Sequence, residues 1–321
     1  MGFFKSIFGG KTSEEKATEG KSERQLQKEF ETLKYDGLRA QRLRRYPFAR
    51  KCLEEAVKMQ DDFEAYGYLA QLLVEMGDLQ AAIEPLEHMA KAEPSITSTF
   101  ISLTNVYFML DKYQESAGNA QVAIDLEPNN PQPYFLKAKA TNAMKQYSEA
   151  VDLLDKAITL RDDYAEALLL RGQIYLLQGQ LTEALSDADA VIAADQEVDS
   201  ALLLRGSVQE VAGKLEEAET DYRQVLELDP FNQQAFIALG KLFIQQGRFN
   251  DAVTMMDDAI EMSPVLAEAY MLRAEAKKQI GDAEGAAKDA MAAANLQAAG
   301  EVKIEVLDPA ASIKEIDIMH L

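Results

Sequence analysis

The sequence has few of the residues that build catalytic and metal sites. It contains no tryptophan, one cysteine and two histidines among 321 residues. Because His88 and His320 lie in distant parts of the chain, the sequence predicts neither a histidine metal cluster nor a Ser-His-Asp triad. The glycine motifs of Walker A and Rossmann sites are also absent. The sequence therefore predicts no catalytic residues, no metal ion and no cofactor.

The features of secreted and membrane-spanning proteins are missing as well. Lone Cys52 cannot form an intramolecular disulfide, which favours a reducing compartment. No apolar run reaches about 18 residues, the length typical of a transmembrane helix. The apolar residues before Gly9 and Gly10 are too few for the core of a secretory signal peptide. We therefore expect a cytoplasmic protein.

Acidic residues outnumber basic ones, but the excess is uneven along the chain. Residues 1–60 hold 14 Lys and Arg against 9 Asp and Glu, and the remaining residues hold 19 against 45, which makes +5 and −26. Because so acidic a chain repels phosphate backbones, we expect no nucleic-acid partner. One basic stretch is either a solvated helix face or a contact for an acidic partner or lipid headgroups. It comprises Arg39, Arg42, Arg44, Arg45, Arg50 and Lys51.

The sequence contains a repeat with a period of 34 residues. ALLLRG occurs at 167–172 and again at 201–206. Seven blocks begin at residues 63, 97, 131, 165, 199, 233 and 267, and an eighth, one residue shorter, begins at about 30. The eighth place is always small: Gly37, Ala70, Thr104, Ala138, Gly172, Gly206, Gly240 and Ala274. So is the twentieth: Ala49, Ala82, Ser116, Ala150, Ala184, Ala218, Ala252 and Ala286. Small residues let two helices cross closely.

Turn signals separate the two predicted helices of each block. The fifteenth place is Gly in five blocks, at 77, 179, 213, 247 and 281, and Gly tolerates the positive φ of a helix end. Asp111 and Lys145 replace it in two blocks, which predicts looser turns there. Proline follows the second helix at 94, 128, 230 and 264. Each block therefore predicts a helix, a tight turn and a second helix.

This pattern resembles the tetratricopeptide repeat (TPR), with residues 232–264 close to its consensus. The resemblance covers residues 30–300 and implies an all-α, right-handed superhelical solenoid of about eight helix-turn-helix units, stabilised by the stacking of neighbours. Residues 1–29 would hold an apolar decapeptide, a linker and the start of the first helix, and 301–321 a tail. Aspartate pairs at 61–62, 162–163 and 257–258 fall at block junctions or on an exposed helix, so we interpret them as solvated acids.

In the TPR family the first helix of each block lines a concave groove for peptides or partner helices. The groove places are the second, fifth, ninth, twelfth and thirteenth. The resemblance therefore predicts an apolar floor of Ile101, Phe108, Phe135, Leu169 and Leu176. Beside it, four residues would hydrogen-bond the ligand: Asn105, Lys139, Asn142 and Gln173. Alternatively, some of these apolar residues pack between neighbouring first helices. Because Lys139 and Lys241 stand three blocks apart, the pattern does not predict a clamp on a ligand carboxylate.

Both ends of the chain depart from the repeat. The first ten residues, MGFFKSIFGG, place four large apolar residues on one side of a short helix. That segment would contact a membrane interface, dock in the protein's own groove or remain a free tail. Ser22 and Gln25 form a capping box for the first helix. At the other end, residues 302–306 alternate in a strand-like way, and 309–319 would form a short helix that covers the last block.

The sequence thus favours a non-enzymatic scaffold that binds a partner peptide or helix in its groove. The alternative is a membrane-peripheral adaptor or assembly factor, tethered by residues 1–10. The sequence indicates neither the identity of the partner nor the oligomeric state.

Overall fold

The structure is a computed structural model that describes residues 22–195 and 198–306. Within these ranges every regular element is a helix, and sixteen are present. The chain divides into two units, residues 1–161 and 162–321, which are described separately. The first unit contains α2 (Glu23–Arg42), α3 (Tyr46–Met59), α4 (Phe63–Glu75), α5 (Leu79–Ala92), α6 (Thr97–Met109), α7 (Tyr113–Leu126), α8 (Pro131–Ala143) and α9 (Tyr147–Leu160). The second contains α10 (Ala165–Leu177), α11 (Leu181–Ala193), α12 (Val198–Val211), α13 (Leu215–Leu228), α14 (Gln233–Gln245), α15 (Phe249–Met262), α16 (Ala267–Gln279) and α17 (Ala283–Val306).

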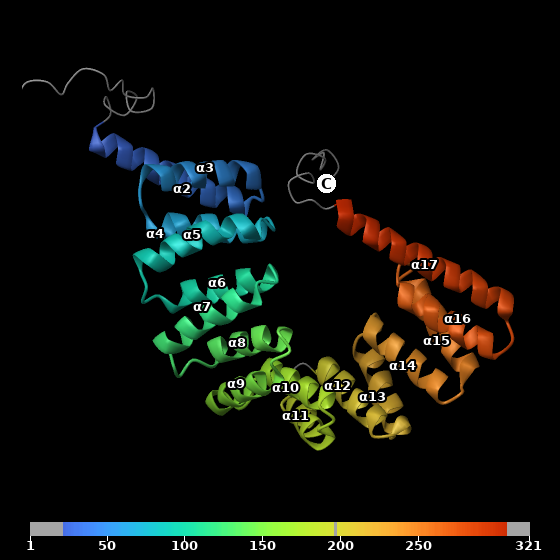
Figure 1. Cartoon of the computed structure of the whole chain (residues 1–321). Coiled ribbons are helices and arrows are strands. Elements are labelled where there is room, and N and C mark those ends of the chain that lie inside the picture. The colour runs from blue at the N-terminus through green and yellow to red at the C-terminus, as the bar shows by residue number, and fades with distance from the viewer. Residues whose placement is uncertain (1–21, 196–197, 307–321) are drawn as a thin grey trace, which may run out of the picture. The chain divides into compact units, whose positions relative to one another are not determined.

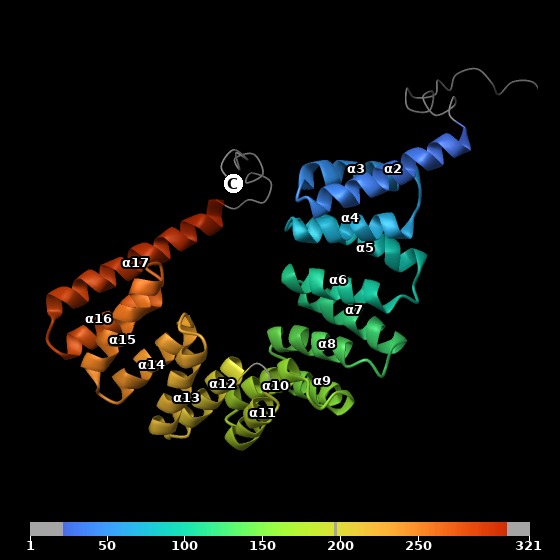
Figure 2. The ribbon, with the colours of Figure 1, turned by 180° about the vertical axis from the view of Figure 1, so that it is seen from behind.

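The helices pair as the 34-residue period predicts, and within each unit the pairs stack one on the next (Figures 1 and 2). The eighth and twentieth places lie inside the pairs and are buried in every block except the last. At Gly206, an added Cβ would lie 2.5 Å from Cε1 of Tyr222, which is 1% exposed. The all-α solenoid of helix pairs is therefore confirmed in each unit, with close helix crossings at the small residues.

The turn between paired helices keeps one geometry in all the blocks. Gly77 has a φ of 77°, and Arg44, Asp111 and Lys145 take 56°, 57° and 61° at the same place. The main chain closes in the same way around them: the N–H that follows Arg44 donates to the carbonyl of Ala40 over 2.9 Å. The prediction of looser turns at Asp111 and Lys145 is therefore wrong, because both residues adopt the left-handed conformation.

The ends of the described chain test two other predictions. The capping box is confirmed, because Ser22 Oγ accepts from the Gln25 N–H and the Ser22 N–H donates to Gln25 Oε1. The strand-like interpretation of 302–306 is wrong, because α17 continues to Val306. Extending an existing helix by a turn needs no new nucleus, and five alternating residues are too few to override it. The apolar segment at 1–10 and the short helix at 309–319 lie outside the described residues.

Candidate partner-binding surface

Six of the predicted binding residues lie on α6 and α8 of the first unit. Asn105 is exposed and the other five are half-buried. Lys139 Nζ lies 4.7 Å from the ring centroid of Phe108 and 5.8 Å from that of Phe135, so the structure brings these three side chains together. Ile101 packs against the core of the first unit, as the alternative interpretation expects. Asn142, the last of the six, is half-buried on α8.

The other three predicted residues lie on α10 of the second unit. Gln173 is exposed, Leu176 is half-buried and Leu169 is only 9% exposed. So little of the Leu169 side chain is accessible that packing within the unit accounts for most of its surface. The structure therefore divides the predicted set between the two units, six residues in one and three in the other.

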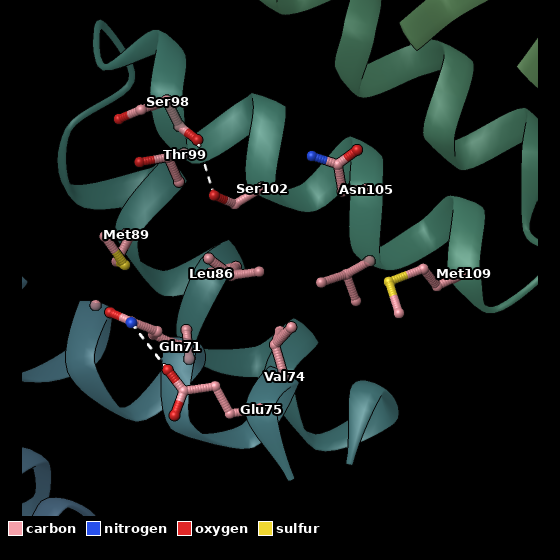
Figure 3. A pocket seen from close by; sticks show the side chains of 13 residues that line it. Gln71, Val74, Glu75, Leu86, Met89, Ser98, Thr99, Ser102, Asn105 and Met109 are labelled. Carbon is pink, nitrogen blue, oxygen red and sulfur yellow. Dashed lines mark hydrogen bonds between the residues drawn. The ribbon is translucent and has the colours of Figure 1, made fainter. Parts of the chain in front are cut away.

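A cavity of about 450 Å³ lies between α4 and α6 of the first unit, with α5 contributing two side chains. Figure 3 shows Gln71 and Val74 on one side of it and Asn105 on the other, with Leu86 between. Its remaining lining is largely apolar, with hydroxyls from α6. It comprises Gly67, Ala70, Glu75, Met89, Ser98, Thr99, Ser102, Val106 and Met109.

The cavity is open because one block lacks a side chain at the fifth place. That place holds Ile101 and Phe135 in the next two blocks, but Gly67 in this one. A Cβ added to Gly67 would meet only Met89, whose Cε lies at an ordinary 3.5 Å, so the position has room for a side chain. The missing side chain thus leaves the space between α4 and α6 unfilled.

Some polar side chains of this cavity are already hydrogen-bonded, whereas the buried Thr99 hydroxyl has no hydrogen-bond partner among the described residues. Gln71 donates to Glu75 over 3.0 Å, and Ser102 Oγ donates to the Ser98 carbonyl over 3.0 Å. The Asn105 side chain makes no hydrogen bond with a residue that the structure describes. Its amide can therefore donate and accept at the same time, which is what the backbone of a bound peptide requires.

A second cavity, of about 400 Å³, lies between α12 and α14 of the second unit. Its chemistry is charged: Lys241 pairs with Glu268 over 2.7 Å, and the Tyr222 hydroxyl donates to Glu210 over 3.1 Å. Burial raises the pKa of Tyr222 well above its ordinary value, so this hydroxyl stays protonated. The ninth place lines both cavities, with Gln71 and Asn105 in the first and Ser207 and Lys241 in the second. A third cavity, of about 600 Å³, lies elsewhere, among α3, α4 and α5, and is lined mainly by residues of the second helices such as Arg50 and Gln80.

Sequence reasoning missed several lining residues and a set of ion pairs. Met109, at the thirteenth place, is 57% exposed and lines the first cavity. In three blocks of the second unit, an arginine at the seventh place donates two hydrogen bonds to a buried aspartate sixteen residues later. The arginine that recurs in ALLLRG was the feature of the sequence that could have predicted these pairs. The pairs are Arg171 with Asp187, Arg205 with Asp221 and Arg273 with Asp289.

Asp62 and Asp257 depart from the interpretation of the adjacent aspartates as solvated acids, whereas Asp162, Asp163 and Asp258 are exposed, as that interpretation expects. Asp257 binds Arg273 over 2.6 Å, and Asp62 accepts from the Ala65 N–H as the cap of α4. Burial alone would raise the pKa of Asp289, but hydrogen bonds from Arg273 and Lys277 outweigh burial and hold it below its ordinary value. The carboxylates of Asp62, Asp257 and Asp289 therefore bond to groups of the fold.

Two observations on the described residues bear on other kinds of site. Between residues 22 and 306, the two uncertain positions aside, no three His, Cys, Asp or Glu residues are grouped so that they could hold a metal ion. In the same part of the chain, no helix combines the length and the apolar character needed to cross a membrane.

Comparisons with known proteins agree with this architecture. Family models described as tetratricopeptide repeat match residues 37–95, 135–197, 184–233 and 212–276, which together span more than half of the chain. A tetratricopeptide repeat protein from Parabacteroides merdae is 21% identical, with a TM-score of 0.63 over 77% of this chain and 98% of that one. PilW, a type IV pilus biogenesis factor, is 21% identical, with a TM-score of 0.58 over 63% and 92%. Yeast Tom70 is 17% identical, with a TM-score of 0.52 over 94% and 60%. A search of curated proteins gave no match. At these identities the likeness shows the fold.

Proposed function

Because the chain belongs to the tetratricopeptide repeat family, we propose that it is a non-enzymatic scaffold whose first-helix face binds a segment of a partner protein. Within that face we assign the main contact to the α4–α6 cavity, which we name the Gly67 cavity. The tether through residues 1–10, predicted from the sequence as the alternative, falls outside the described residues and stays a prediction.

The observation that carries this proposal is the combination of an apolar cavity with a free amide. A volume of about 450 Å³ lies in the range of protein binding pockets and would take one or two large apolar side chains. Met109 and Val74 supply apolar surface in its lining, and Asn105 supplies both a donor and an acceptor. A partner segment with apolar anchors fits this chemistry, with Asn105 bonding the main chain between them.

The surface would extend from the cavity along α6 to α8. Phe108 and Phe135 are half-buried, and the Lys139 ammonium is held over both rings. An aromatic pair fixed in this way offers a rigid apolar contact with little side-chain entropy left to lose on binding. The partner would therefore lie across two or three consecutive blocks of the first unit.

Filling the cavity tests the proposal. Gly67→Leu places a leucine where the next two blocks have isoleucine and phenylalanine, without a backbone clash. Because leucine also favours the helix over glycine, the variant should keep or raise the melting temperature. Gly118→Leu is the matched control, because Gly118 is exposed on α7 with open space around it. Affinity capture from extracts of the source cells, read by mass spectrometry, should lose its specific partners with Gly67→Leu and keep them with Gly118→Leu.

A second variant tests the extension to α8. Phe135→Ser should weaken capture by about 30-fold or more, which corresponds to the loss of about 2 kcal/mol typical of an aromatic hot spot. The melting temperature should stay close to that of the wild type. A variant that melts much earlier would instead assign Phe135 to the packing between blocks. Capture that survives both Gly67→Leu and Phe135→Ser would contradict the proposed function.

A further inference from the structure

The turn between α2 and α3 is the most basic turn of the chain. Residues 39–45, RAQRLRR, carry four arginines and no acid, a charge of +4. The corresponding seven residues of the other blocks carry between −2 and +1. In a chain with a net charge of −21, this turn is therefore a local exception whose charge is concentrated in a few residues.

The arginines of this turn are not used by the fold. All four are exposed, and none forms an ion pair with another described residue. By contrast Arg50, on α3, binds Glu54 over 2.7 Å and Asp78 over 2.8 Å. The C-terminal dipole of α2 attracts basic residues in its last turn, but Arg44 and Arg45 lie beyond the helix end. Their charges are thus available to an external partner.

Large apolar side chains stand among these charges. Leu43 is 61% exposed at the end of α2, and Phe48 is 55% exposed in the first turn of α3. A solvated charge run does not account for exposed leucine and phenylalanine on either side of the same tight turn. Apolar side chains flanked by arginines are typical of segments that enter the boundary between headgroups and acyl chains.

The backbone adds a third observation. Arg44 has a φ of 56° at the place where five blocks have glycine. A residue with a Cβ is strained in this conformation, whereas glycine is not. Asp111 and Lys145 share this conformation at the same place, but Arg44 alone among the three stands among further arginines. Strained residues cluster at functional sites, where something other than stability favours the side chain.

From these three observations we propose that the α2–α3 turn binds an anionic lipid surface. The guanidinium groups of Arg42, Arg44 and Arg45 pair with lipid phosphates, and Leu43 and Phe48 enter the headgroup region. The acidic remainder of the chain does not prevent this, because charges farther than about 8 Å from the contact are largely screened at physiological salt. A projecting apolar turn suits a deformable bilayer better than the surface of an acidic protein. The proposal is independent of the Gly67 cavity.

A matched pair of variants tests the turn in the full-length chain. Arg44→Gly removes one charge and relieves the strained conformation, so the fold should be as stable as the wild type or more so. Lys145→Gly is the control: it also removes one positive charge and relieves a left-handed conformation, of φ 61°, at the fifteenth place of another block. In flotation with phosphatidylcholine vesicles that contain phosphatidylglycerol, Arg44→Gly should weaken binding about five-fold, the usual effect of one basic residue near such a surface. Lys145→Gly should bind like the wild type, and pure phosphatidylcholine should bind poorly.

Two further arms test the apolar side chains of the turn and the N-terminal segment separately. Leu43→Ser with Phe48→Ser should weaken binding to the anionic vesicles, and the loss should persist at high salt, where the electrostatic attraction fades. Replacing Phe3, Phe4 and Phe8 by serine tests the N-terminal segment. If that variant alone abolishes binding and Arg44→Gly has no effect, the proposal is overturned. A wild-type chain that does not float with anionic vesicles overturns the proposal too. In that case, weaker capture of an acidic protein by Arg44→Gly would assign the turn to a protein partner.

Discussion

The Arg205–Asp221 ion pair gives a quantitative test of how the blocks of the second unit are held. Asp221 has a side chain only 5% exposed and accepts two hydrogen bonds from Arg205, of 2.8 and 2.7 Å. Arg205 also binds Asp189 of the preceding block over 3.0 Å. The next block has Leu239 and Met255 at the two places of this pair, and both belong to its apolar core. The chain itself therefore shows an apolar alternative to the ion pair.

Removing only the arginine should be costly. Arg205→Leu leaves the Asp221 carboxylate buried without its counter-ion, which typically destabilises by about 3–5 kcal/mol. The lost contact with Asp189 adds less than about 1 kcal/mol, because that carboxylate is half exposed. The double variant Arg205→Leu with Asp221→Met copies the next block and removes the buried charge. It should lie within about 1–2 kcal/mol of the wild type, since apolar replacements of buried ion pairs are often neutral.

The assay must resolve the region around the pair. Stacked repeats need not unfold as one unit, so a single melting temperature would mix several transitions. Hydrogen exchange followed by mass spectrometry on α12 and α13 reports the local opening free energy, with about ten-fold faster exchange for each 1.4 kcal/mol. The reasoning is refuted if the double variant exchanges as fast as Arg205→Leu, or if Arg205→Leu exchanges like the wild type.

Three further predictions concern single residues. Gly206→Ala should destabilise the second unit by about 1 kcal/mol, because the clash with Tyr222 exceeds the gain in helix propensity. Gly118→Ala should stabilise the first unit by up to about 1 kcal/mol. Hydrogen exchange on the helices around each position measures both effects, and equal effects would disprove the close crossing. Because the pKa of Asp289 is lowered in the folded protein, the stability that its carboxylate contributes is complete above the ordinary carboxyl pKa of about 3.9 and is lost as the pH falls through the lower pKa of the folded state. Asp289→Asn should therefore flatten the fall in stability at acid pH. An unchanged fall would count against the ion pair. Burial raises the pKa of the Cys52 thiol, so iodoacetamide should label it only after unfolding, and rapid labelling of the native protein would contradict its burial.

The helix pairing was predictable because its causes recur at fixed spacing. Small residues at two places mark the helix crossings, and glycine at a third marks the turn. Eight repetitions make this pattern unambiguous, and the capping box at Ser22 follows from two residues alone. These features depend on local residue types, which is why the sequence suffices for them.

The proposed binding surface was less predictable because it depends on contacts between blocks and on missing side chains. Lys139 meets Phe108 of the preceding block, a contact that no local pattern shows. The Gly67 cavity arises from a side chain that is absent, and in the sequence Gly67 reads only as an exception at the fifth place. The left-handed conformation of Arg44 is likewise set by the two helices that its turn must join.

Photo-crosslinking from within the Gly67 cavity tests the proposed scaffold function most directly. A photoreactive residue would replace Met109, which lines the cavity, or Val122, which is 38% exposed on α7 outside it. Irradiation in cells, followed by mass spectrometry, should give discrete partner adducts at 109 that disappear when Gly67→Leu is added, and none at 122. Adducts at 109 that survive Gly67→Leu, or adducts confined to 122, would contradict the account.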